Sequence, residues 1–141
     1  MSRENLEPRY PSTALTAAGI THAMLTYRYR DAGDLDGYGS LLDEGVEVAE
    51  PGAPRCRGRG EVLRSEAGAT GRRGRHRLRR VVAEGDTIVV IGRLSAPDGS
   101  TAEDGPEDVE FVDVFTLSDA ALILDCRRYY HAEPWAPPAP A

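Results

Sequence analysis

The chain has 141 residues, of which 40% are hydrophobic and 28% charged, and its formal net charge is −6. This length and apolar fraction predict one domain with a hydrophobic core, and they exclude a multidomain enzyme and an intrinsically disordered chain. No apolar run approaches the roughly 20 residues of a membrane-spanning helix. Because the first residues lack the apolar core of a secretory signal, we expect a cytoplasmic protein. Two cysteines are too few for a disulfide framework or a zinc site.

Both ends of the chain differ in composition from its middle. Residues 1–11 are polar and contain two prolines, and residues 132–141 are rich in proline and alanine. Such segments are typical of chain ends outside a packed core. We therefore expect a flexible N-terminal segment over 1–11, a single domain over 12–131 and a C-terminal tail over 132–141.

The first half of the domain predicts helices. A helix capped by Ser12 or Thr13 and ended by Gly33 is indicated by apolar residues at spacings of three and four. Asp34 can cap a second, shorter helix that ends near Gly45. A short strand over 46–50 and a third helical piece over 60–70 follow.

The second half predicts strands. Two of them, over 75–83 and 87–95, flank a Glu-Gly-Asp turn, and two more lie over 109–117 and 121–131. A polar loop over 97–108 separates the pairs. Helices followed by strands predict an α+β domain, with N-terminal helices packed on one face of a curved antiparallel sheet.

Two carboxylates are candidates for acid/base chemistry. Alternation along 46–50 places Glu50 on the apolar face of its strand, where loss of hydration would raise its pKa and favour a general base. Alternatively, Glu50 faces solvent or caps the next turn. Asp113 lies between apolar residues on one face of the strand over 109–117, which is costly unless it is protonated, hydrogen-bonded or paired. The alternative is a structural carboxylate satisfied by backbone amides or by an arginine such as Arg128.

His76 is a third candidate for acid/base chemistry, at the start of the first long strand. Alternation gives it Leu78, Arg80 and Val82 as neighbours on its face. The alternative is a histidine at the surface or at the sheet edge.

Six arginines occur within residues 72–80, and such runs can bind phosphates or nucleic acid. However, Arg75, Arg77 and Arg79 alternate, as on the solvated face of a strand, and the whole chain is acidic. Nucleic-acid binding is therefore not expected, whereas an anionic substrate or an acidic partner is compatible with the run.

The sequence resembles the nuclear transport factor 2-like superfamily, which includes SnoaL-like polyketide cyclases and ketosteroid isomerases. The resemblance covers roughly residues 14–131. It is carried by YRYRDAGDLDG at 27–37, LLD at 41–43, VEVAEPG at 46–52, VEFVDVFTL at 109–117 and RRYY at 127–130. It implies a cone-shaped α+β barrel that encloses a deep, mostly apolar pocket, and a homodimer.

The resemblance also implies roles for individual residues. Glu50 matches a carboxylate that shuttles a proton, Asp113 a protonated aspartic acid that donates to an enolate, and His76 the acid/base of dehydratase-like members. Thr26 stands where the isomerases have a tyrosine, which is a departure from their pattern. The residues expected to bind the substrate are Tyr27, Tyr38, Phe111, Phe115, Arg128 and Tyr130.

These features favour an enzyme that needs no cofactor or metal and that isomerises, cyclises or dehydrates an apolar, oxygenated, polyketide-like metabolite, as in natural-product biosynthesis. One alternative is a noncatalytic ligand-binding or dimerisation module of the same fold, in which Glu50 and Asp113 face solvent or are neutralised by arginines. A second alternative is an epoxide hydrolase, which would need an Asp-Arg-Asp arrangement to which Asp113 and Arg128 could contribute.

Overall fold

A computed structural model of the protein describes residues 13–69, 74–95 and 108–131. The expected end segments, 1–11 and 132–141, lie outside these residues, as does nearly all of the loop predicted over 97–108. The elements are α1 (Thr13–Ala32), α2 (Leu35–Ser40), β1 (Leu42–Ala49), β2 (Cys56–Arg57), α3 (Arg59–Ala69), β3 (His76–Glu84), β4 (Thr87–Leu94), β5 (Val109–Leu117) and β6 (Ile123–Tyr130).

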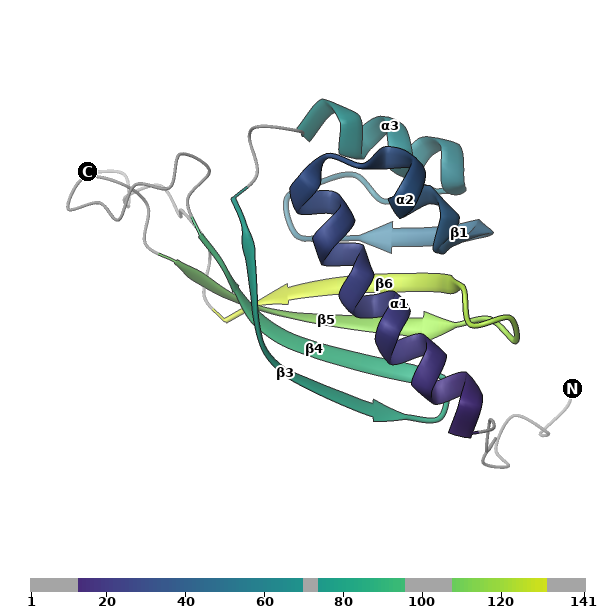
Figure 1. Cartoon of the computed structure of the whole chain (residues 1–141). Helices are drawn as coiled ribbons and strands as arrows, with labels where there is room; N and C mark the ends of the chain where they lie inside the picture. Colours follow the sequence, from purple (N-terminus) through teal and green to yellow (C-terminus); the bar gives the residue numbers. More distant parts are fainter. Residues whose placement is uncertain (1–12, 70–73, 96–107, 132–141) are drawn as a thin grey trace, which may run out of the picture.

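The strands form one curved sheet, in the order β2-β1-β6-β5-β4-β3, and the helices cover one of its faces (Figure 1). Helix α1 crosses this face and contacts β3, β4 and β6, whereas α3 packs on β1. The predicted α+β class is confirmed. The sheet is mixed, however, because β1 runs parallel to β6 while the other neighbours are antiparallel. It is also open, with β2 and β3 at its edges.

The boundary between α2 and β1 differs from the prediction. The Asp34 side chain caps α2, as expected, by accepting a hydrogen bond of 2.8 Å from the Gly37 amide. The helix ends at Ser40, because Leu42 already pairs with Ile123 of β6. The prediction of helix as far as Gly45 was therefore wrong.

Strand β3 contains a register shift between Leu78 and Arg80. The shift moves Val81 to the buried side of the sheet and leaves Val82 50% exposed. The neighbours predicted for His76 by simple alternation are therefore correct for Leu78 and wrong for Arg80 and Val82. A bulge of this kind adds one residue to a strand and reverses the alternation beyond it.

The interior contains charged groups as well as apolar ones. Phe111, Phe115 and Ile88 are at most 1% exposed, and Asp113 and Arg128 lie among them. No helix in the described part of the chain is long and apolar enough to cross a membrane.

Candidate functional site

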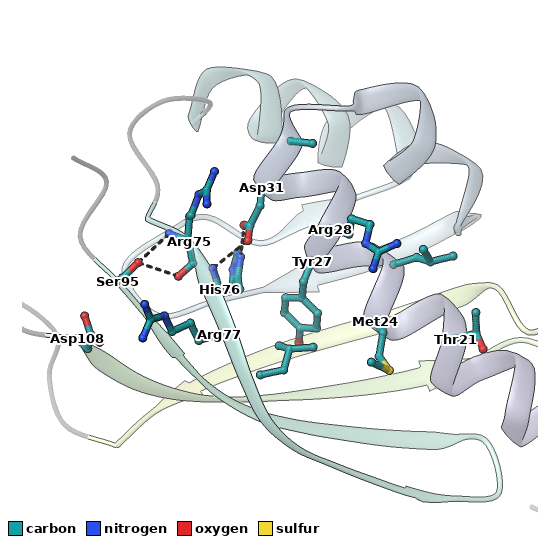
Figure 2. A pocket seen from close by; sticks show the side chains of 13 residues that line it. Thr21, Met24, Tyr27, Arg28, Asp31, Arg75, His76, Arg77, Ser95 and Asp108 are labelled. Atoms are coloured by element: carbon teal, nitrogen blue, oxygen red, sulfur yellow. Dashed lines mark hydrogen bonds and ion pairs between the residues drawn. The ribbon is translucent and has the colours of Figure 1, made fainter. Parts of the chain in front are cut away.

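His76, the first residue of β3, is held by Asp31 in the last turn of α1 (Figure 2). Its ring Nδ1 lies 2.6 Å from Oδ1 of Asp31, and its backbone amide donates to Oδ2 over 3.0 Å. One carboxylate thus fixes both the position of the strand and the orientation of the imidazole.

The protonation state of His76 follows from these contacts. Burial lowers the pKa of His76 to about 4, in spite of the bond to Asp31, so the ring is neutral at physiological pH. An ionised carboxylate can only accept hydrogen bonds, and Nδ1 therefore carries the ring proton. Burial alone would raise the pKa of Asp31, but its hydrogen bonds from His76 lower it overall. The lone pair of His76 consequently lies on Nε2.

Nε2 of His76 is buried and has no hydrogen-bond partner within the described residues. The ring packs against aromatic side chains, with centroids 5.0 Å from Tyr27 and 5.6 Å from Phe111. A polar atom left unpaired in such surroundings is unusual in folded proteins and calls for an explanation. A neutral imidazole nitrogen with a free lone pair is a suitable proton acceptor.

A cavity of about 920 Å³ adjoins this histidine, between α1 and the first residues of β3. Its volume is in the range of small-molecule sites, which is about 300–1,000 Å³. Apolar and charged side chains both face it. The lining residues are Thr21, Met24, Leu25, Tyr27, Arg28, Asp31, Ala32, Arg75, His76, Arg77, Leu78, Ser95 and Asp108.

Asp113 belongs to a second cluster, deeper in the domain. It accepts hydrogen bonds from the Tyr27 hydroxyl over 2.6 Å and from Nε and Nη2 of Arg128, each over 2.8 Å. Burial alone would raise the pKa of Asp113, but the bonds and charge of Arg128 hold it below its usual value. The structure thus has the paired, ionised carboxylate that the sequence left as an alternative, and a protonated Asp113 does not agree with it.

Tyr27 links the two clusters. Its ring lies against His76, while its hydroxyl donates to Asp113. Burial raises the pKa of Tyr27 far above its ordinary value, with the negative charge of Asp113 adding to the effect. The hydroxyl is therefore a structural donor in this state of the protein.

Glu50 follows Ala49, which pairs with Arg127 of β6. Strand β1 ends at Ala49, so Glu50 is not its last residue, as the prediction required. The side chain is half-buried and does not line the cavity. The predicted strand end at Glu50 was thus one residue too long, and the role of Glu50 as a base stays a prediction.

Of the six residues expected to bind the substrate, Tyr27 lines the cavity and the other five do not. The guanidinium of Arg128 stacks 4.3 Å from the Phe111 ring and 5.9 Å from that of Tyr130. Phe115 meets Tyr27 edge-on, and Tyr38 is buried in α2. Phe111 and Phe115 thus support the cavity wall through Tyr27, and Phe111 also packs on His76.

Sequence reasoning missed Asp31 and the cavity-lining residues Arg28 and Met24. A usable signal for Asp31 was its spacing of four from Tyr27, which places both side chains on neighbouring positions of one helix face.

A family model described as the SnoaL-like domain matches residues 25–124, which is well over half of the chain. The chain belongs to the SnoaL-like domain family. This SnoaL-like protein matches no curated protein in sequence.

Solved structures similar to this SnoaL-like protein establish its fold. Bal32a, from a soil-derived mobile gene cassette, is 21% identical with a TM-score of 0.70, over 83% of this chain and 92% of Bal32a. A protein from Kribbella flavida, provisionally named a ketosteroid isomerase, is 21% identical with a TM-score of 0.69, over 89% of this chain and 85% of its own. An LEH-like epoxide hydrolase from Mycobacterium tuberculosis is 22% identical with a TM-score of 0.64, over 82% and 84%.

Proposed function

We propose that this SnoaL-like protein is an acid/base enzyme in which Nε2 of His76 removes a proton from a carbon next to a carbonyl group. The substrate would be an apolar, oxygenated small molecule bound in the cavity between α1 and β3. The observation that carries the proposal is the state of one imidazole, whose Nδ1 is fixed by Asp31 while its buried Nε2 has no partner.

Asp31 supports this chemistry in two ways. Its bond to Nδ1 selects the tautomer with the lone pair on Nε2, and its negative charge stabilises the imidazolium that forms when Nε2 takes the proton. Asp31 is therefore a positioning residue, and the proton-accepting atom belongs to His76.

One proton shuttle serves the three reactions that the fold family suggests. Return of the proton from His76 to another carbon gives an isomer, and its transfer to a leaving hydroxyl group gives a dehydrated product and water. If the enolate carbon instead attacks a carbonyl of the same molecule, the proton passes to the new alkoxide and the product is a ring. The residues of the cavity support the proton transfer, and the structure of the substrate determines which of the three products forms.

The rival function is a noncatalytic binding module. In its favour, Asp113 is neutralised by Arg128, and Glu50 lies outside the cavity. Against it stands the unpartnered nitrogen of His76. An epoxide hydrolase has less support, because it would need an arginine between two aspartates. Within the described residues, Arg128 bonds to one carboxylate, that of Asp113.

A ring-opening reaction tests the proposal without knowledge of the natural substrate. Nitrobenzisoxazole loses its C–H proton to a base while its N–O bond breaks, and the resulting cyano-nitrophenolate is measured by its absorbance. We expect the protein to accelerate this reaction and the His76→Asn variant to lose roughly 10²-fold or more, because a positioned general base contributes about 10²–10⁴-fold. The asparagine amide can still donate to Asp31.

The matched control is His131→Asn, which removes an exposed histidine beyond the end of β6. It should retain the full rate. A His76→Asn variant as active as this control, or a wild-type protein no faster than the same concentration of free imidazole, would refute the proposal.

We further propose that the protein is a homodimer. The resemblance to the nuclear transport factor 2-like superfamily implies one, and the sheet offers a surface for it on the face opposite the helices. There Val82 and Tyr129 are 50% and 53% exposed. Val82 pairs with Val89 and Val89 with Val114, while Tyr129 pairs with Val112, two residues before Val114 on the same face. A contiguous apolar surface of this kind commonly marks a protein interface.

A further inference from the structure

Three arginines line the cavity beside His76. Arg28 lies on α1, Arg77 lies on β3, and Arg75 is the residue immediately before β3 (Figure 2). All three are exposed, and none has an ion pair within the described residues, whereas Arg57, Arg79 and Arg127 each pair with a carboxylate. The side-chain hydrogen-bond donors of the three cavity arginines are thus available to a bound molecule.

The charges of the described residues that line the cavity do not cancel. Three guanidinium groups stand against two carboxylates, Asp31 and Asp108, because His76 is neutral. Three positive and two negative charges leave one positive charge, in a chain whose net charge is −6. Asp31 is moreover engaged by the ring and the backbone amide of His76. Among the described lining residues, the positive charges thus outnumber the negative ones by one.

The remainder of the lining is suited to an apolar body. Met24 and Leu25 lie one helical turn before Arg28, and Leu78 follows Arg77 along β3. Met24 is 47% exposed, so that part of its apolar surface is open to a bound molecule. Apolar and positive groups thus occur side by side on both walls of one cavity.

We infer that the cavity binds an apolar small molecule that carries one carboxylate. The carboxylate would pair with a guanidinium group of the set Arg28, Arg75 and Arg77, whose planar donor pair matches its two oxygens. The apolar body would lie on Met24, Leu25 and Leu78, next to His76. This inference rests on the proposed function, because it describes the substrate class of the same cavity.

The test compares the binding of naphthoate and naphthamide, which have nearly the same shape and differ in charge. By calorimetry at low salt, we expect naphthoate to bind about tenfold or more tightly than naphthamide, because hydrogen bonds to charged groups are the stronger ones. The triple variant Arg28→Gln/Arg75→Gln/Arg77→Gln should bind both compounds equally.

The matched control is the triple variant Arg64→Gln/Arg80→Gln/Arg93→Gln, which removes three exposed arginines that do not line the cavity. It changes the net charge by the same amount and should keep the preference for naphthoate. Equal binding of the two compounds by the wild-type protein, no binding of naphthoate, or a preference that survives in the cavity triple variant would overturn the inference.

The same variants separate this inference from the proposed chemistry. His76→Asn should retain the preference for naphthoate, since His76 supplies no charge to it. A protein that prefers naphthoate but does not open nitrobenzisoxazole would refute the proton-transfer proposal and support anion binding.

Discussion

Asp113 shows how a single buried charge is stabilised in this domain. It is 1% exposed and would be unfavourable there without the two hydrogen bonds from Arg128 and the one from Tyr27. These bonds also tie β5 to β6 and to α1 at one point. The carboxylate thus contributes to the stability of the wall behind His76.

Replacement of Asp113 by asparagine should strongly destabilise the protein. The guanidinium of Arg128, itself 6% exposed, would remain charged and lose its ionic partner. Breaking one half of a buried ion pair costs about 3–5 kcal/mol. The free energy of unfolding, measured in urea for Asp113→Asn, should fall by about this amount.

Glu50→Gln is the control for this measurement, because it removes a carboxylate for which the described residues show no side-chain partner. It should change stability by about 0.5 kcal/mol or less. An Asp113→Asn variant as stable as Glu50→Gln would mean that Asp113 is kept for a function and not for stability, since functional groups are often held at the expense of stability.

At the scale of elements, apolar periodicity was enough to predict most of the fold. Strand β5 has the predicted bounds, and the β3–β4 hairpin lies within one or two residues of the predicted one. The errors have physical causes. Leu42 fits a helix stripe and a buried strand equally well, and alternation cannot reveal the bulge after Leu78.

The sequence pattern also does not determine whether β1 runs parallel or antiparallel to its neighbour. Two hairpins determine how β3 pairs with β4 and β5 with β6, because a short turn forces antiparallel strands. No turn connects β1 to β6, and the chain passes through the rest of the sheet between them. Their parallel pairing is therefore set by tertiary packing.

The sequence predicted part of the candidate site, and the residues that it missed have a physical explanation as well. His76 stood out as a histidine at the start of a strand and Tyr27 as a tyrosine on the apolar stripe of its helix, and the family resemblance gave both a role. Asp31 did not, because its importance comes from a contact with a residue 45 positions away in the chain. Glu50 attracted attention through an alternation that stops one residue before it.

At the scale of the whole molecule, the two faces of the sheet differ in what they carry. The helical face holds the cavity, and the opposite face carries the apolar surface around Val82 and Tyr129. If this surface forms the proposed homodimer, Tyr129→Glu should produce a monomer, because a charge would be buried at the interface. Light scattering coupled to size-exclusion chromatography measures the mass directly.

Met24→Glu places the same charge on an exposed apolar residue of the helical face and should leave the dimer intact. A wild-type protein that elutes as a monomer at micromolar concentrations would refute the proposal of a homodimer.

An NMR titration of the ring nitrogens in isotope-labelled protein determines whether His76 is a neutral base with its lone pair on Nε2. We predict a protonated Nδ1 and an unprotonated Nε2 at neutral pH, with protonation of the ring only near a pKa of about 4. The Asp31→Asn variant should lose the strict preference for this tautomer. A proton on Nε2 at neutral pH, or an ordinary pKa of about 6.5 for His76, would exclude this role for the histidine.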